Sequence, residues 1–443
     1  MNTPICDFAE NYASKNTLRL HMPGHKGIGP LGVERLDLTE INGADVLYSP
    51  NGIIAESEKN ARRLFGSGKT VYSTEGSSLS IRAMLFLAAL WGKENGKERK
   101  ILAGRNAHRV FHGACALLDI EVDFIETGAV MDCPITPQIL DDALKDYDIK
   151  PCAVYLTSPD YLGNTLDIEA LSKICHSHGT LCLVDNAHGA YLKFLSPSLH
   201  PMDKGADMCA DSAHKTLPAL TGAAYLHISE KAPALLSEQA ESAMALFAST
   251  SPSYLILQSL DALNAYLDGG YKDNLAKWEH ICAEIKVKLK NAGYKIEGNE
   301  PLKITLSPKS YGYTGEEIAE ILEESGAACE HSDRDFTVLM LTPSLDEKKL
   351  TKVIERLLTL PKREKIEARP PHLTKKIKGT SMKEALLSPK EQIPVSQALG
   401  RITADCAVSC PPAIPITVCG EIIDEEAIKA FEYYGIEKVS VLK

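Results

Sequence analysis

The sequence lacks several features, and each absence excludes a class of protein. No uninterrupted apolar run of about 18 residues occurs, so no membrane span is expected. The start, MNTPICDFAENYASKN, lacks the basic residues and apolar core of a secretory signal, so we expect a cytoplasmic protein. The formal net charge of −11 argues against broad binding to nucleic-acid phosphates. The same charge suits a small cationic substrate.

The 12 cysteines follow no pattern that is typical of a metal site or a disulfide framework. No CxxC motif occurs, and Cys406 and Cys410 have no matching second pair. Cys182, Cys209 and Cys282 lie in apolar runs. We therefore expect reduced, buried thiols.

Short apolar segments alternate with helical ones between residues 70 and 228. Strands are expected at 101–103, 122–125, 153–157, 181–184, 208–210 and 223–228, and helices at 108–118 and 167–178. This alternation predicts an α/β fold, a mostly parallel sheet with helices on both faces.

The 443 residues are too many for one hydrophobic core, so several domains are expected. Residues 1–45 precede the first clear element and are expected to form an arm that wraps a partner subunit. The sheet domain is expected over 46–268. A smaller α+β domain is expected over 269–365, with a strand at 303–307 and helices at 315–326 and 346–360. The final segment would span 366–443, after a charged stretch that contains prolines.

Polar clusters stand at the ends of several predicted strands: STEGSS (73–78), TSPD (157–160), DNAH (185–188) and DSAHK (211–215). Ligands of parallel sheets bind beyond the carboxyl ends of the strands. In STEGSS, Gly76, Ser77 and Ser78 precede a helical run, where backbone N–H groups and hydroxyls suit a phosphate. An ordinary serine cap of the helix is the alternative.

Lys215 is a long cation among small and hydroxyl residues, which is unusual for a solvated lysine. A lysine amine can form a Schiff base with an aldehyde cofactor. Pyridoxal 5'-phosphate (PLP) needs such a lysine, an acid that keeps its pyridine nitrogen protonated, and a phosphate cup. Lys215, Asp185 and the stretch 76–78 supply these three features, and Ser212 and His214 add phosphate donors. An exposed loop lysine is the alternative.

Other interpretations exist for two of the polar groups. Asp185, at the end of LCLVD, could be a structural cap or a member of an ion pair. His108 and His112 lie one helical turn apart and could face a common metal ion. No third ligand is evident nearby, so no metal site is predicted.

Eight stretches resemble the Orn/Lys/Arg decarboxylase family of fold-type-I PLP enzymes: LHMPGHKG (20–27), DLTEINGADVLYSPNGII (37–54), GRNAHRVFHGA (104–114), TSPDYLGNTLDI (157–168), VDNAHGA (184–190), DSAHKTLPALTG (211–222), STSPSYLI (249–256) and PPAIPITVCGE (411–421). They keep the family's order and span nearly the whole chain. The last stretch is the most specific, because other fold-type-I branches do not share it. The resemblance implies an aspartate-aminotransferase-like sheet domain that binds PLP.

The resemblance also implies roles for individual residues. Lys215 would hold PLP covalently, Asp185 would pair with the pyridine nitrogen and His108 would stack on the ring. His188 would lie beside the cofactor, near the substrate, as a catalytic residue.

The phosphate would be held by Gly76, Ser77, Ser78, Ser212 and His214. Ser249 would reach the phosphate of the neighbouring subunit, which implies a homodimer, or a larger assembly, with shared active sites. His25 and Glu421 are candidate substrate-pocket residues.

The implied reaction is the decarboxylation of arginine, lysine or ornithine to the amine, in polyamine metabolism. Arginine is favoured because the chain resembles the short, biosynthetic branch. Two residues depart from the family pattern. Glu75 stands where asparagine is common, so its carboxylate is expected to point away from a phosphate or to contact another group. Asn186 replaces the glutamate of the DEAHG form.

Two alternative functions stay open. An aminotransferase of the same fold would need an arginine clamp for the substrate carboxylate, for which Arg369 and Arg401 are candidates. A scaffold or regulatory protein that kept the fold without the cofactor is the other alternative.

Overall fold

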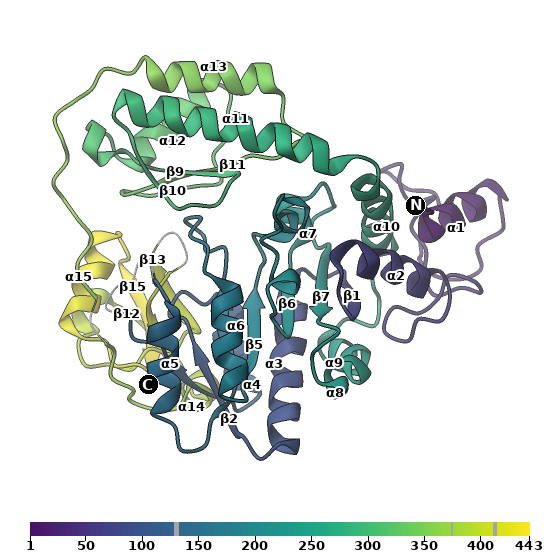
Figure 1. Ribbon diagram of the computed structural model, residues 1–443, viewed down its shortest axis with the longest axis horizontal. Helices are drawn as coiled ribbons and strands as arrows, with labels where there is room; N and C mark the ends of the chain where they lie inside the picture. The colour runs from purple at the N-terminus through teal and green to yellow at the C-terminus, as the bar shows by residue number, and fades with distance from the viewer. Residues whose placement is uncertain (128–132, 374, 411–413) are drawn as a thin grey trace. The chain divides into compact units, whose positions relative to one another are not determined.

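The computed structural model describes residues 1–127, 133–373, 375–410 and 414–443 (Figure 1). The chain divides into two compact units. The first unit comprises residues 1–98 and 168–273, and the second comprises 99–167 and 274–443. The domain boundaries expected after residues 45, 268 and 365 stay predictions.

The largest sheet has seven strands in the order β1-β7-β6-β5-β4-β2-β3. β2 and β3 pair in parallel, as do β5 and β6, whereas β7 is antiparallel to both β6 and β1. The mostly parallel α/β sheet is therefore confirmed, with β1 as a strand that the sequence analysis did not predict. The strands are β1 (Lys69–Ser73), β2 (Glu98–Ala103), β3 (Glu121–Phe124), β4 (Pro151–Thr157), β5 (Leu181–Asp185), β6 (Met208–Asp211) and β7 (Ala224–Ile228).

Apolar packing in the first unit holds these strands in place. Every residue of β5 is buried, as expected for an interior strand of a parallel sheet. Helix α3 (Ser77–Glu94) packs along β1, β5, β6 and β7, and α6 (Ile168–Ser177) packs on β5 (Figure 1). Leu79, Ala83 and Leu87 repeat every four residues of α3 and are buried. This packing fixes the loops that follow β1, β5 and β6.

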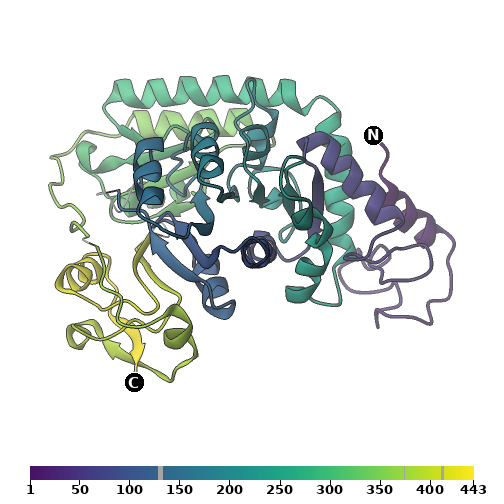
Figure 2. The same cartoon turned by 60° about the horizontal axis from the view of Figure 1, so that its bottom comes forward.

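The N-terminal residues contain a helix, α1 (Pro4–Ser14), which corrects the expectation that no clear element precedes residue 46. α1 packs against α2 (Ile53–Phe65) and α10 (Tyr254–Asp268), as both views show (Figures 1 and 2). Asp261 of α10 accepts the N–H groups of Ile5 (2.9 Å) and Cys6 (3.0 Å), which satisfies donors that the first turn leaves open. The unit's other helical elements are α7 (Ala213–Thr216), α8 (Ala234–Glu238), α9 (Ala240–Phe247) and the 3-10 turns η1 (Ala190–Phe194) and η2 (Pro201–Asp203).

The second unit contains the predicted α+β elements. The strand expected at 303–307 is β9 (Lys303–Ser307), and the two expected helices are α12 (Gly315–Glu324) and α13 (Glu347–Leu358). β9 belongs to an antiparallel sheet with the order β10-β11-β9-β8. The remaining elements here are α4 (Arg109–Leu117), α5 (Pro137–Lys145), α11 (Tyr271–Ala292), β8 (Lys295–Glu297), η3 (Pro308–Tyr311), β10 (His331–Ser332) and β11 (Thr337–Met340).

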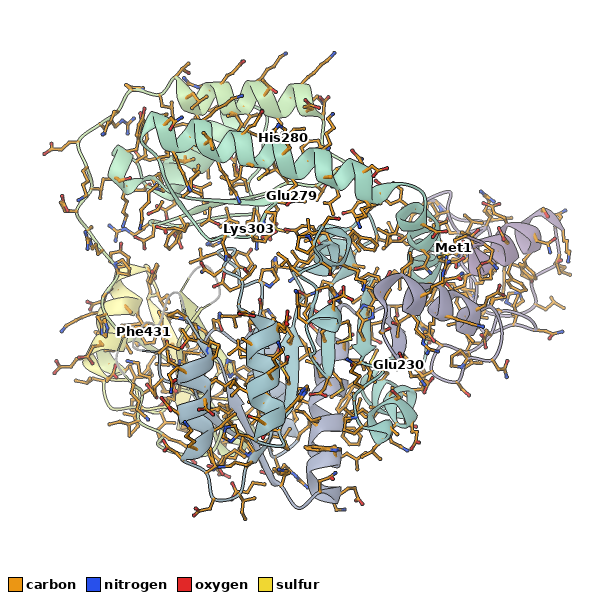
Figure 3. All side chains as sticks on the ribbon, in the orientation of Figure 1. Met1, Glu230, Glu279, His280, Lys303 and Phe431 are labelled. Atoms are coloured by element: carbon orange, nitrogen blue, oxygen red, sulfur yellow. The ribbon has the colours of Figure 1, made fainter. Side chains whose placement is uncertain are left out.

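The C-terminal segment forms its own small core, which the sequence analysis did not divide into elements. Two antiparallel strand pairs, β12 with β15 and β13 with β14, are accompanied by two helices. Phe431 is fully buried among aliphatic side chains of this segment (Figure 3). The elements are α14 (Met382–Leu387), β12 (Lys390–Pro394), η4 (Val395–Gln397), β13 (Ala407–Cys410), β14 (Ile414–Val418), α15 (Glu425–Tyr433) and β15 (Lys438–Leu442).

Within the described ranges, no helix is both long and apolar enough to cross a lipid bilayer. The eleven cysteines whose side chains are described are free thiols.

Candidate active site

Several strand ends of the first unit meet at one edge of the sheet. β5 and β6 run parallel with Asp185 opposite Ala210, so that Asp185 and Asp211 end neighbouring strands at the same edge. β7 begins at this edge, where its Ala224 lies opposite Ser73, the last residue of β1. The loops STEGSS, DNAH and DSAHK therefore come together, as sequence reasoning predicted.

Lys215 and His188 meet at this edge. Lys215 lies on the short helix α7, and its Nζ is 3.2 Å from Nε2 of His188 in the loop after β5. The lysine side chain is exposed, whereas His188 is buried. Two nitrogens at this distance can exchange a proton. The structure thus joins the predicted lysine to a predicted catalytic histidine 27 residues earlier in the chain.

Asp185 is buried at the end of β5. Its Oδ1 accepts the backbone N–H of Ala187 at 3.2 Å, so the turn itself sets the direction of the carboxyl group. A buried carboxylate needs such donors, because removal from water disfavours the charged form.

The loop after β1 presents the start of helix α3. The helix begins at Ser77, and its N-cap is Gly76, with φ 69° and no side-chain capping bond. The serine cap considered as the alternative is therefore not observed. Glycine tolerates the positive φ, and a Cβ here would contact the His214 ring at 3.8 Å. Ser212 Oγ donates to Ser77 Oγ at 2.8 Å, so two hydroxyls from different loops lie beside the open helix end.

Other predicted residues surround this helix end. Ser78 is half-buried in the first turn of α3, and His214 Nδ1 lies 2.9 Å from the Ala223 carbonyl oxygen. Glu75 does contact another group, as expected: its Oε1 accepts the N–H of Ser249 at 2.7 Å. The Ser249 hydroxyl accepts the N–H of Ser251 at 3.1 Å. Glu75 thus ties the Ser249 loop to the loop that follows β1.

His108 and Glu421 belong to the second unit. His108 is the N-cap of α4, and its Nδ1 accepts the N–H of Val110 at 3.3 Å. Glu421 forms a two-point ion pair with Arg105, in which Nη2 donates to Oε2 at 2.7 Å, and Oε2 also accepts the N–H of Val418 at 2.9 Å. Sequence reasoning missed Arg105, although it lies in the stretch GRNAHRVFHGA. The part of the C-terminal stretch at 411–413 falls outside the described residues.

His112, considered with His108 as a possible metal pair, and His25, a candidate pocket residue, both bond groups of the protein itself. In the second unit, His112 Nε2 bonds the Ala107 carbonyl at 3.2 Å, and burial lowers the pKa of His112 to about 3. His112 and His108 thus bond different backbone groups rather than facing a common point. In the first unit, His25 Nε2 pairs with Asp37 at 3.2 Å, and its Nδ1 accepts the N–H of Gly27 at 2.9 Å.

Two family models match most of the chain. Residues 3–292 match the family model "Orn/Lys/Arg decarboxylase, major domain", and residues 368–439 match its C-terminal domain. An arginine decarboxylase of Bacillus subtilis (strain 168) is 30% identical, over 96% of this chain and 92% of that protein.

Two solved structures show the same fold at low identity. Lysine decarboxylase A from Pseudomonas aeruginosa is 16% identical with a TM-score of 0.80, over 99% of this chain and 80% of that one. A serine palmitoyltransferase variant from S. paucimobilis with a bound PLP–myriocin aldimine is 12% identical with a TM-score of 0.53, over 69% of this chain and 75% of that one. With both family models matched in order, the chain belongs to the Orn/Lys/Arg decarboxylase family.

Proposed function

We propose that this protein is a PLP-dependent enzyme that decarboxylates a basic L-amino acid, with arginine preferred over lysine and ornithine. The observation that carries the proposal is the meeting of Lys215, His188, Asp185, Ser77 and Ser212 at one edge of the sheet. The arginine preference rests on the name of the Bacillus subtilis relative. We place the reaction in polyamine metabolism and, from the free thiols, in the cytoplasm.

The residues of the first unit fit PLP. The uncapped start of α3, with the hydroxyls of Ser77 and Ser212 beside it, suits the phosphate group. Asp185 is a buried acid that suits a protonated pyridine nitrogen. Lys215 supplies the amine that binds an aldehyde. When bound, PLP supplies an acceptor for the electron pair that remains on Cα as CO2 leaves.

Each side chain has a task in this scheme. Asp185 would hold a proton at the ring nitrogen, and Lys215 would hold the cofactor through Nζ. Lys215 Nζ and His188 Nε2, 3.2 Å apart, are assigned to move the proton that Cα receives after CO2 has left. The roles of His108, His25 and Glu421 stay predictions that rest on the resemblance alone. Those of Ser78 and His214 stay predictions too, and rest also on their places in the loops that meet at the start of α3.

An aminotransferase is less well supported. Its arginine clamp needs a guanidinium that is available to the substrate carboxylate. Arg401, one of the two candidates, donates to Glu391 at 2.7 Å and to the Leu442 carbonyl oxygen. Arg401 is thus occupied in the C-terminal segment.

The proposal is tested by measuring CO2 release from L-arginine, L-lysine and L-ornithine in parallel with PLP present. We expect CO2 release from L-arginine to be faster than from L-lysine or L-ornithine by about tenfold or more. The side chains of the other two amino acids differ from that of arginine in length and head group. A keto acid assay on the same samples is the control. Keto acid formation without CO2 would contradict the proposal in favour of the aminotransferase.

We also propose a homodimer. The stretch 18–31 exposes a series of large apolar side chains, each at least 71% exposed: Leu18, Leu20, Met22, Ile28 and Leu31. Large apolar side chains gathered in this way are typical of an interaction site. In such a dimer the Ser249 loop, held by Glu75, would complete the phosphate cup of the partner subunit.

Mixing two inactive variants tests the shared site. Lys215→Ala and Ser249→Phe should each be inactive alone. Equal mixing with subunit exchange should restore about a quarter of the wild-type activity, since half the dimers are mixed and each has one intact site. CO2 release after refolding or exchange is the measurement, with native mass spectrometry to show heterodimers. An absence of rescue when heterodimers are present would contradict the shared site.

A further inference from the structure

A buried polar cluster lies beside the candidate active site in the first unit. Its centre is Asp211, the last residue of β6, which is fully buried. Asp211 Oδ1 accepts from Asn186 Nδ2 at 2.7 Å, and Oδ2 pairs with His200 Nε2 at 2.8 Å. His227 Nε2 lies 3.5 Å from Oδ2, and His227 Nδ1 bonds Thr70 Oγ1 at 2.8 Å. We refer to these five side chains as the Asp211 cluster.

The Asp211 cluster is better described as a hydrogen-bonded network than as a metal site, although His200, Cys209 and Asp211 place possible ligand atoms close together. His200 Nδ1 accepts the N–H of Met202 at 3.3 Å, so the ring proton lies on Nε2 and points at Asp211. A metal ion would need that nitrogen without its proton. Burial also holds the pKa of the Cys209 thiol well above its ordinary value, so the thiolate that binds metals is disfavoured.

The Asp211 carboxylate keeps its charge inside the protein. Burial alone would raise its pKa, but the imidazoles of His200 and His227 outweigh burial and hold that pKa below its ordinary value. A buried charge is tolerated only while its donors stay in place. Oδ1 accepts from the Asn186 amide at 2.7 Å and, at the longer distance of 3.8 Å, from the Cys209 thiol. The Asn186 amide and the Asp211 carboxylate therefore constrain each other.

The contact between Asp211 and Asn186 joins two parts of the proposed cofactor site. Asn186 directly follows Asp185, and its backbone N–H also bonds the Ala210 carbonyl of β6 at 3.0 Å. Ser212 directly follows Asp211 and donates to Ser77 at the start of α3. The acid assigned to the pyridine nitrogen and the hydroxyl assigned to the phosphate are thus each one residue away from this contact.

We propose that Asp211 is a positioning residue, which fixes the Asp185 carboxylate and the Ser212 hydroxyl relative to each other through its charge-assisted hydrogen bond with Asn186. The inference rests on the proposed PLP function. It also accounts for the amide at position 186, where the family's DEAHG form has glutamate. A carboxylate there would face the Asp211 carboxylate across a hydrogen-bond distance, and like charges in a buried site repel.

A charge-swap cycle tests the proposal by PLP titration and by the visible spectrum of the bound cofactor. Asn186→Asp should weaken PLP binding at least about tenfold and shift the spectrum, because it sets two carboxylates face to face. The double variant Asn186→Asp with Asp211→Asn should bind within about threefold of wild type. Its amide and carboxylate are exchanged, while the introduced side chain at 211 keeps an oxygen for His200.

Thr70→Val is the matched control, because it perturbs the same cluster at its far side, where Thr70 meets His227. It should lower the melting temperature without changing PLP affinity. If Asn186→Asp fails to fold, Asn186→Ala takes its place, with a smaller expected loss of affinity of about threefold or more. If Thr70→Val and the Asn186 variants change PLP affinity and the spectrum alike, in step with their loss of stability, Asp211 is not a positioning residue. The same conclusion follows if the double variant does not recover PLP affinity.

The unsubstituted protein is titrated first, which separates this proposal from the proposed function. Failure of the wild type to bind PLP contradicts both. A wild type that binds PLP, together with an Asn186 variant that binds it equally well with the same spectrum, contradicts only the role of Asp211.

Discussion

Replacement of Lys215 by alanine is expected to abolish CO2 release, with a loss of about 10⁴-fold or more, while the protein stays folded. The loss is large because the amine that would hold the cofactor is removed, and because His188 loses the nitrogen 3.2 Å away with which we propose that it exchanges a proton. The stability change should be small, within about 0.5 kcal/mol, because the side chain is exposed and leaves no cavity. Steady-state CO2 release and thermal unfolding measure the two effects.

Borohydride reduction identifies the lysine that holds PLP. In the wild type, the reduced cofactor should be found by peptide mass on Lys215, and in Lys215→Ala it should be absent. Lys231→Ala is the matched control, since Lys231 is also an exposed lysine of the first unit and has no assigned role. Reduced cofactor on a lysine other than Lys215 in the wild type would show that the assignment is wrong.

Local sequence pattern predicted the sheet because the strands are short apolar runs set between helical segments. β5 reads LCLVD and is wholly buried, and the next strand in the chain ends at Asp211 in the same way. Since parallel strands end at one edge, the pattern also predicted that Asp185 and Lys215 would lie in neighbouring loops. The contact between Lys215 and His188 follows from the same geometry.

The features that sequence reasoning missed depend on contacts between distant parts of the chain. Helix α1 is anchored by Asp261, whose carboxylate accepts hydrogen bonds from N–H groups more than 250 residues away in the sequence. Arg105 forms an ion pair with Glu421, which lies 316 residues further along the chain. The motif that contains Glu421 therefore indicated a pocket residue but could not indicate Arg105 as its partner. β12 and β15 pair across the whole C-terminal segment, and such non-local pairing leaves a weak local signal.

The Asp185→Asn variant is expected to reduce CO2 release by roughly 10³-fold, because the carboxylate that holds the ring proton is lost. The change is close to isosteric. The asparagine oxygen can still accept the N–H of Ala187, which now bonds Asp185 Oδ1 at 3.2 Å, so the turn should keep its shape. The affinity for PLP should therefore fall by less than about tenfold. The rate at saturating substrate and a PLP titration separate the two effects.

The two substitutions should differ in what they leave behind, and this difference tests the division of roles between Asp185 and Lys215. Asp185→Asn keeps the amine, so borohydride should still fix the cofactor on Lys215 although turnover is lost, whereas Lys215→Ala should lose both. Asp273→Asn removes the same charge from an exposed site of the first unit and should leave the rate unchanged. Near-normal turnover in Asp185→Asn would mean that another group keeps the ring nitrogen protonated. If Asp185 acts only by keeping the ring nitrogen protonated, the covalent bond between PLP and Lys215 should form without it. Loss of the fixed cofactor in Asp185→Asn would therefore assign Asp185 to cofactor retention instead.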